Sequence, residues 1–196
     1  ILLATIFDFF DGWFARKLKS KSNFGAELDS LSDFVSFGVA PSFLIYLWST
    51  NTLGSLGWGA TLFFVICSAL RLARFTADIY ITNKPIDDNE YFVGVPSPAA
   101  AGLLLLPLFM FFEFDFDFLK NEYLNLVITM IIGIMMISKI PTISIKKIQI
   151  NQRYKTWIFL IFVIVCVALI SKIWLTLVAV LSLYLLSIIY IVFKTR

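Results

Sequence analysis

Long apolar runs recur along almost the whole chain and are separated by short polar stretches. Hydrophobic residues make up 60% of its 196 residues, which is far above the level of an ordinary globular domain. A helix needs about 20 apolar residues to cross a bilayer. Six segments approach that length: Gly25–Ser49, Gly57–Tyr80, Ser97–Phe114, Tyr123–Ser138, Thr156–Ile170 and Ile173–Phe193. We therefore predict an all-α fold, a polytopic bundle of transmembrane helices.

A seventh span is only partly visible at the start of the chain. The opening "ILLATIF" offers seven apolar residues before Asp8, too few to cross a membrane, and it does not resemble the apolar core of a signal peptide. Since the chain also lacks an initiator Met, we expect these residues to be the tail of a helix whose upstream part is missing. No linker or internal repeat interrupts the segments, so we predict one transmembrane domain over residues 1–196 with about seven visible spans.

Basic residues gather in every second loop between the predicted spans. They are Lys17, Lys19, Lys21, Lys84, Lys146, Lys147, Arg153, Lys155, Lys194 and Arg196. The alternate loops differ, because "STNTLGSLGW" carries no charge and "EFDFDFLKNE" is acidic. Lysine and arginine mark cytoplasmic loops. We therefore expect an integral protein of the cell membrane whose charged site faces the cytoplasm.

The rest of the composition excludes several kinds of site. The chain has no histidine, which removes the usual general base and the commonest metal ligand. Cys67 and Cys166 stand alone in apolar segments, so they predict neither a disulfide framework nor a zinc site. A net charge of +3 without a basic patch gives no support to nucleic-acid binding. Any chemistry must therefore depend on carboxylates.

Four aspartates lie close together in sequence near the start of this apolar chain. Asp8 and Asp11 are three residues apart, and Asp29 and Asp33 are four apart, so each pair shares one face of a helix. Carboxylates that converge at a membrane boundary repel one another unless cations neutralise them. An all-oxygen site without His or Cys suits Mg²⁺, Mn²⁺ or Ca²⁺. The pattern predicts two such ions about 4 Å apart, a common arrangement for moving a phosphate-linked group.

Small residues and one arginine stand between the two aspartate pairs. Gly12, Ala15 and Gly25 would let phosphates or a flat ring approach the backbone. Arg16 can bind phosphate or an aspartate through its planar fork of donors. Each of these residues taken alone could equally be a helix cap, a turn or a side chain that reaches lipid headgroups. The whole set together favours a phosphate-binding site.

Written out, the pattern resembles a family signature. It reads Asp8-x2-Asp11-Gly12-x2-Ala15-Arg16-x8-Gly25-x3-Asp29-x3-Asp33 and is similar, without a gap, to that of the CDP-alcohol phosphatidyltransferases. The resemblance implies a transmembrane helical enzyme, with homodimers as its assembly. It also implies a reaction in which a lipid-linked CDP group donates its phosphatidyl moiety to the hydroxyl of a small alcohol and releases CMP.

The resemblance further implies a role for each motif residue. Asp8, Asp11 and Asp29 would be the main ligands of two divalent cations, Mg²⁺ or Mn²⁺, and Asp33 would complete the metal site and act as general base. The residues implied for the CDP-lipid site are Gly12, Ala15, Arg16 and Gly25. Such a base is chemically reasonable, because an alcohol is a poor nucleophile at neutral pH until its proton is removed.

Three further stretches resemble the serine-specific branch of the family. They are "LDSLSDFVSFGVAPSF", "ALRLARF" and "YFVGVPSPAAAG". They imply CDP-diacylglycerol as donor and L-serine as acceptor, although Thr76 and Val95 depart from the pattern usual in that branch. Glycerol 3-phosphate or inositol phosphate as acceptor, and an archaeal CDP-lipid as donor, stay open. So does a different class, a divalent-cation transporter that uses the aspartates as a relay.

Serine carries a carboxylate, so its site needs a fixed cation. Arg71 and Arg74 are three residues apart near the cytoplasmic end of a span, and either could bind that carboxylate bidentately. Alternatively, Arg74 and Asp78 could form a surface ion pair. Ser36 follows Asp33 closely and could contact the acceptor, or its hydroxyl could bond its own helix.

The remaining segments predict structure more than chemistry. Pro96 and Pro98 are expected to open a span, and a direct contact of Ser97 with substrate is left open. The closing stretch, residues 156–193, carries few polar groups. It predicts two plain spans that face lipid or a partner subunit.

Overall fold

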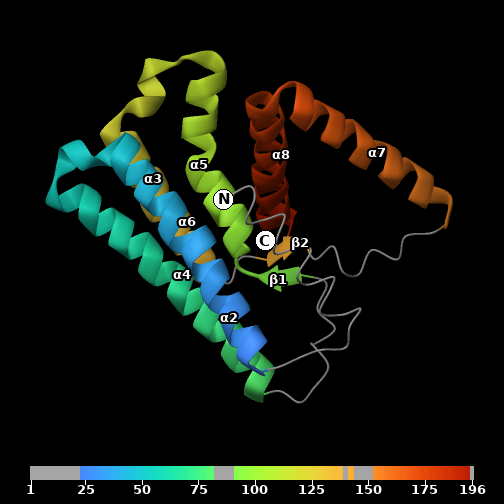
Figure 1. Cartoon of the computed structure of the whole chain (residues 1–196), viewed down its shortest axis with the longest axis horizontal. Coiled ribbons are helices and arrows are strands. Elements are labelled where there is room, and N and C mark those ends of the chain that lie inside the picture. The colour runs from blue at the N-terminus through green and yellow to red at the C-terminus, as the bar shows by residue number, and fades with distance from the viewer. Residues whose placement is uncertain (1–22, 82–90, 139–140, 144–151, 195–196) are drawn as a thin grey trace.

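The computed structural model describes residues 23–81, 91–138, 141–143 and 152–194. All six predicted spans are helical, and all of them except the fifth pack into one bundle (Figure 1). In chain order the elements are α2 (Asn23–Asp33), η1 (Phe34–Val39), α3 (Ala40–Trp48), η2 (Thr50–Leu53), α4 (Ser55–Ile81), β1 (Tyr91–Val93), α5 (Ser97–Phe114), η3 (Asp117–Lys120), α6 (Glu122–Ile137), β2 (Pro141–Ile143), α7 (Gln152–Ser171) and α8 (Ile173–Lys194). The all-α class is confirmed. The predicted seventh span, before Asp8, lies outside the described residues.

Four helices in the described ranges are long and apolar enough to cross a membrane. They are Glu27–Trp48, Ser55–Arg74, Ser97–Phe114 and Ile173–Ile191, and α6 is apolar but shorter. Together they identify an integral membrane protein. The turns around Gly54, Asp115 and Lys172 lie at one end of the bundle, while α2 begins and α4 ends at the opposite end (Figure 1). This agrees with the prediction that the uncharged loop and the acidic loop share one side of the membrane, while most of the basic residues of the other loops lie outside the described ranges.

The first described span is one continuous helix with a wider turn inside it. α2 passes into η1, a π-helical turn, and η1 passes into α3 without a break. The backbone N–H of Ala40 bonds to the carbonyl of Val35, five residues earlier, as a π-helix requires. The extra residue in this turn rotates α3 relative to α2. Polar residues on α2 can therefore face away from the core while α3 packs into it.

Local chemistry explains where the central helices begin and end. Pro96 and Pro98 flank the first residue of α5, where the missing N–H groups cost nothing, and the carbonyl of Pro96 accepts a bond from the N–H of Ala100. Asp115 ends α5 with φ 52°, and its N–H bonds to the carbonyl of Phe111. The side chain of Asn121 caps α6, since its Oδ1 accepts from the backbone N–H groups of Tyr123 and Leu124. The predicted start of a span at the prolines is confirmed.

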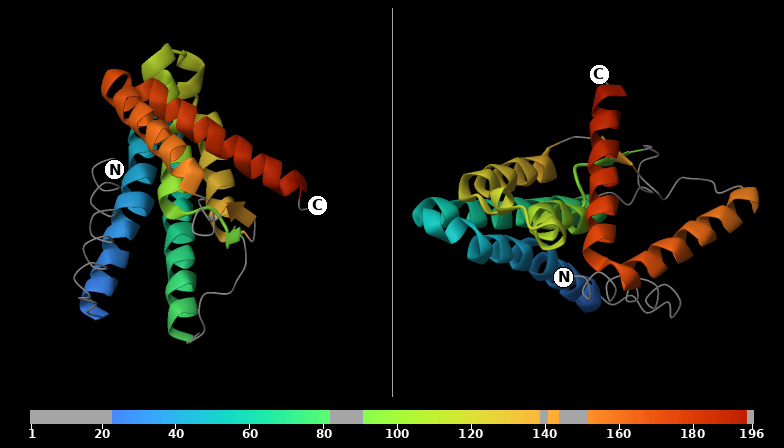
Figure 2. Two further views of the ribbon diagram at one scale, coloured as in Figure 1. Left: turned by 90° about the vertical axis from the view of Figure 1, so that its right-hand side faces the viewer. Right: turned by 90° about the horizontal axis from the view of Figure 1, so that it is seen from above.

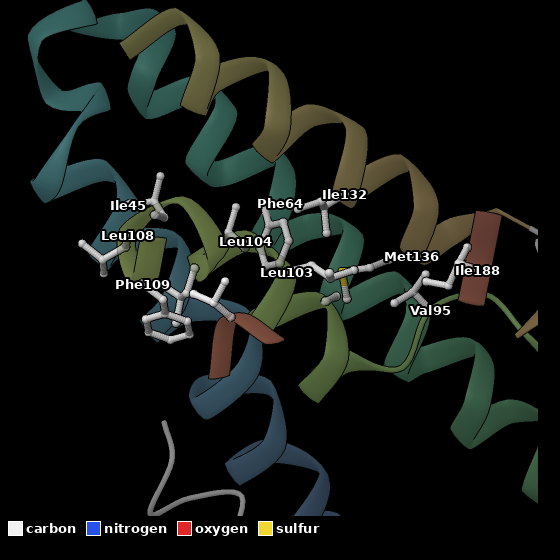
Figure 3. Close-up of a cluster of buried hydrophobic side chains, with 13 residues drawn as sticks. Ile45, Phe64, Val95, Leu103, Leu104, Leu108, Phe109, Ile132, Met136 and Ile188 are labelled. Carbon is white, nitrogen blue, oxygen red and sulfur yellow. The ribbon is translucent and has the colours of Figure 1, made fainter. Parts of the chain in front are cut away.

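α5 occupies the centre of the bundle. Its residues are buried on all sides along most of its length, as expected for a helix that is apolar all round. Figure 3 shows Leu103 and Leu104 of α5 among Phe64 of α4 and Ile132 of α6. Such a central helix fixes the positions of the helices that surround it.

α8 packs one face into the core, while most of its residues are exposed or half-buried, as expected for a span that faces lipid or a partner subunit. Val178 and Ile188 of α8 are buried in the main cluster, and Ile188 lies beside Val95 and Met136 (Figure 3). The two helices approach closely because α5 has Gly102 at the contact. A Cβ atom there would lie 2.6 Å from the side chain of Leu181. α7 differs, since it diverges from the bundle and most of its described apolar side chains are exposed (Figures 1 and 2).

A pair of short strands was not predicted from the sequence. β1 pairs antiparallel with β2, with Tyr91 opposite Ile143 and Val93 opposite Pro141. Gly94 follows β1 with φ 81°, a backbone conformation that favours glycine. A Cβ atom at Gly94 would lie 2.8 Å from the carbonyl oxygen of Met136, so the backbones also approach closely here. The turn brings the start of α5 against the end of α6.

Gly94→Ala is therefore expected to destabilise the protein by about 2 kcal/mol or more, since the left-handed conformation alone costs an alanine about 1–2 kcal/mol. The close carbonyl of Met136 adds to this cost. The measurement is the thermal unfolding midpoint of the purified protein in detergent. Gly59→Ala is the matched control, because Gly59 is an exposed helical position with no atom within 4 Å of the added carbon. Equal midpoints for the two variants would contradict the prediction.

Candidate functional site

Two of the four predicted aspartates lie on the described part of the chain. Asp29 and Asp33 are one turn apart on α2, with Gly25 one turn before them, so all three lie on one face of the helix. Asp29 is exposed and Asp33 is half-buried. None of the α2 residues whose exposure is described is buried. This face is therefore free of the core and accessible to ligands.

The contact between η1 and α4 sets the height of Asp33 in the bundle. A Cβ atom at Gly38 would lie 2.6 Å from Oγ of Ser68, so the two helices touch there. α2 and α4 run in opposite directions (Figure 1). Asp33 is five residues before Gly38 and Arg71 is three residues after Ser68, and at about 1.5 Å per residue both lie roughly 4–8 Å from the contact, toward the same end. A carboxylate and a guanidinium are thus at similar depth.

Arg71 is held in place by a helix start. Its terminal Nη1 donates to Oγ of Ser97, the first residue of α5, at 2.9 Å. Ser97 is only 9% exposed. The Nε atom of Arg71 is also buried and has no hydrogen-bond partner within the described structure. One edge of the guanidinium is therefore fixed, and a second donor is left for a ligand.

The phenol of Tyr184 on α8 lies within electrostatic range of Arg71. Its hydroxyl is also buried and without a hydrogen-bond partner in the described part of the chain. Buried polar groups in folded proteins are nearly always bonded. Both side chains therefore keep a buried donor that is available to a ligand with acceptor atoms.

The other predicted acceptor residues are placed differently. Arg74 is exposed, one turn beyond Arg71 on α4. Ser36 is half-buried within η1, three residues after Asp33. The alternative ion pair between Arg74 and Asp78 involves a side chain outside the described set. Among these three predicted acceptor residues, Arg71 stands out, because its Nη1 is hydrogen-bonded to Ser97 and its buried Nε has no partner in the described structure.

The rest of the motif lies outside the described residues. These positions are Asp8, Asp11, Gly12, Ala15 and Arg16. No group of three or more His, Cys, Asp or Glu side chains that could hold a metal lies within the ranges that the structure describes. Two aspartates one turn apart on an accessible face supply oxygen donors alone. Such donors fit Mg²⁺ or Mn²⁺ better than zinc or copper.

Sequence reasoning missed Tyr184 and underrated Ser97. Tyr184 lies in the middle of a predicted span, whereas tyrosines in membrane helices concentrate at the two interfaces. That unusual position was the available signal. The sequence leaves the role of Ser97 at the start of a helix open, and the structure gives it a specific partner in Arg71.

The fold and the site together define a helical membrane protein with carboxylates and a half-buried arginine at one end of its bundle. A family model described as CDP-alcohol phosphatidyltransferase matches residues 1–138. The chain belongs to this family. The matched range includes the whole aspartate motif, so the resemblance predicted from that motif is confirmed.

Several similar proteins carry one name, CDP-diacylglycerol–serine O-phosphatidyltransferase. The protein from Methanocaldococcus jannaschii is 38% identical over 172 residues, which cover 87% of this chain and 72% of that protein. The Helicobacter pylori protein is 35% identical over 153 residues, or 78% of this chain and 62% of its own length. The Bacillus subtilis protein is 37% identical over 147 residues, which cover 75% of this chain and 74% of that protein.

Proposed function

We propose that the protein transfers the phosphatidyl group of CDP-diacylglycerol to the hydroxyl of L-serine and so forms phosphatidylserine and CMP. Family membership supports the transfer from a CDP-linked donor. The names of the similar proteins support serine as the acceptor. The structural observation that carries the proposal is Arg71, whose half-buried guanidinium is held by Ser97, keeps one buried donor without a partner and lies at the depth of Asp33.

In the proposed reaction Asp33 acts as general base. Its carboxylate accepts the proton of the serine hydroxyl while the serine oxygen attacks the phosphorus that carries the diacylglycerol. One P–O bond forms to serine, and the P–O bond to the CMP phosphate breaks, so CMP leaves with the bonding electron pair. The half-buried position of Asp33 supports this role, because the carboxylate can reach both substrate and solvent.

The carboxylates that we propose as ligands of two Mg²⁺ or Mn²⁺ ions are Asp8, Asp11, Asp29 and Asp33. Bound ions of this kind supply positive charge to the diphosphate oxygens and to the leaving phosphate. The arrangement of Asp29 and Asp33 on one accessible helical face supports the assignment for that pair. We also assign the CDP-lipid site to Gly12, Ala15, Arg16 and Gly25, of which Gly25 is exposed on the same face as Asp29.

The acceptor side of the proposed site centres on Arg71. Its charge is opposite to that of the serine carboxylate, and burial strengthens the attraction by excluding water. Arg74 and Ser36 remain candidates for contacts with the acceptor from more exposed positions. Serine bound in this way would present its hydroxyl toward α2, where Asp33 lies.

The setting of the site is also part of the proposal. We place the site at the cytoplasmic face of the cell membrane, because the basic residues belong to the loops at that end. We treat residues 1–196 as one domain, since α8 shares its core with α4, α5 and α6. A homodimer is proposed from the family resemblance.

An acceptor panel tests the function. Purified protein in detergent, supplied with Mg²⁺ or Mn²⁺ and CDP-diacylglycerol, is expected to release CMP with L-serine at least about 100-fold faster than with glycerol 3-phosphate or inositol 1-phosphate. The measurement is labelled CMP together with mass spectrometry of the lipid product. A parallel reaction with an archaeal CDP-lipid identifies the donor. Release of CMP with glycerol 3-phosphate but not with serine would replace the proposed acceptor while leaving the family chemistry intact.

A further inference from the structure

We infer that Tyr184 completes a carboxylate subsite with Arg71 and thereby contributes to the recognition of the acceptor, an inference that rests on the proposed function. Tyr184 lies on α8, beyond residues 1–138 that the family model matches. The subsite consists of two donors, Nε of Arg71 and the hydroxyl of Tyr184. Ser97 acts as a positioning residue, because it holds the opposite edge of the guanidinium.

The two donors are unusual within the described structure. Three buried side-chain polar atoms there have no hydrogen-bond partner, and the third is Oδ1 of Asn125. That amide is already held by its nitrogen, which donates to Oγ of Ser49 at 3.0 Å and to the carbonyl of Leu119 at 2.8 Å. Asn125 therefore belongs to a structural network at the other end of the bundle. Arg71 and Tyr184, by contrast, lie within electrostatic range of each other. Both are placed by the first half of α5, which contacts Arg71 through Ser97 and contacts the helix of Tyr184 through Gly102.

Both side chains are held by the packing of their helices. Arg71 is fixed by its 2.9 Å bond to Ser97. Tyr184 is one turn after Leu181, whose side chain packs against Gly102 of α5. It is one turn before Ile188, which is buried beside Val95 (Figure 3). Since α5 contacts both α4 and α8 and is itself central, the relative positions of the two donors are set by the core. A ligand would meet a preorganised pair.

The chemistry of the pair favours a singly charged anion. Both groups can donate a hydrogen bond, and the Nε–H of arginine cannot accept one. Arg71 supplies a single positive charge, and Arg74 is exposed one turn away. A carboxylate has one negative charge and two acceptor oxygens, so it satisfies both donors and leaves no buried charge unpaired. A phosphate monoester, with nearly two charges, would leave one uncompensated. The carboxylate of serine therefore fits the subsite better than a phosphate of the donor does.

The test is Tyr184→Phe, which removes one oxygen atom and keeps the ring. The variant is expected to raise the KM for L-serine about 10- to 100-fold, as expected for losing a hydrogen bond to a charged group, with kcat changed by less than about twofold. The KM for CDP-diacylglycerol should not change. Serinol, in which a hydroxymethyl group replaces the carboxylate of serine, serves as the second acceptor. Its reaction should be equally slow in the variant and the natural protein.

Tyr190→Phe is the matched control, because Tyr190 lies on the same helix and is 66% exposed. It should leave every parameter unchanged. Ser97→Ala tests the positioning role and should also raise the KM for serine, whereas Ser97→Thr, which keeps a hydroxyl, should restore it. Thermal unfolding midpoints in detergent confirm that each variant folds.

The outcomes distinguish a failure of the inference about Tyr184 from a failure of the proposed function. Phosphatidylserine formation by the natural protein with an unchanged KM for serine in Tyr184→Phe would overturn the inference and leave the proposed function standing. A raised KM for CDP-diacylglycerol alone would overturn it too, because the donors would then hold a phosphate. If the natural protein releases no CMP with serine, the proposed function and the inference both fail.

Discussion

Replacing Asp33 with asparagine is expected to lower the rate of serine-dependent CMP release by about 10²- to 10⁴-fold, the usual contribution of a general base. The asparagine has the same shape, but it cannot take the proton of the serine hydroxyl. It is also a poorer ligand for a divalent cation, so the loss should lie at the upper end of this range. The measurement is CMP release at saturating serine and CDP-diacylglycerol.

Asp115→Asn makes the same chemical change at the other end of the bundle. Asp115 is exposed and has a left-handed backbone conformation that asparagine also adopts, so activity and stability should be unchanged. Cation flux into vesicles that contain the protein tests the transporter alternative. If Asp33→Asn kept its CMP release and blocked cation flux, the enzyme hypothesis would have to be abandoned.

Arg71→Lys is expected to raise the KM for L-serine about 10- to 100-fold, although the charge is kept. Lysine lacks the planar fork that can bond Ser97 and a ligand at once, and its ammonium group has no Nε–H in the same position. The measurement is the serine dependence of CMP release, with CDP-diacylglycerol saturating. An unchanged KM would exclude Arg71 from the acceptor site.

Lys172→Arg is the control for exchanging one cation for another. Lys172 is exposed in the turn between α7 and α8, at the end of the bundle away from Arg71, and its substitution should have no effect. Arg74→Lys provides a graded comparison. Because Arg74 is exposed, water already screens its charge, and its substitution should raise the KM for serine less than Arg71→Lys does.

Most of the helical structure could be predicted because its signals are local. The apolar runs set the lengths of the spans, and the prolines before α5 set its start, so the predicted segment Ser97–Phe114 has the bounds of the helix. The spacing of Asp29 and Asp33 predicted a shared face for the same reason. The period of the α-helix alone determines it.

The features that could not be predicted depend on distant parts of the chain. The bond from Arg71 to Ser97 joins residues 26 positions apart, and β1 pairs with β2 across the whole of α5 and α6. The π-helical turn after Asp33 has no proline or charge to mark it. The mid-span position of Tyr184 is unusual, but an apolar span offers no pattern that shows which of its faces is buried, so its partner could not be predicted. These features follow from packing, which only the folded chain reveals.

The close contact between Gly102 of α5 and Leu181 of α8 has a consequence for how the protein is made. α5 forms the centre of the bundle, but the side that receives Leu181 is covered by α8, which leaves the ribosome much later. Chains fold as they are synthesised, with earlier segments emerging first. During insertion into the membrane, that side of α5 must therefore face lipid or an insertion factor until α8 arrives. We therefore expect the bundle to close only after α8 has been inserted, and mutations that delay α8 should act on assembly before they act on chemistry.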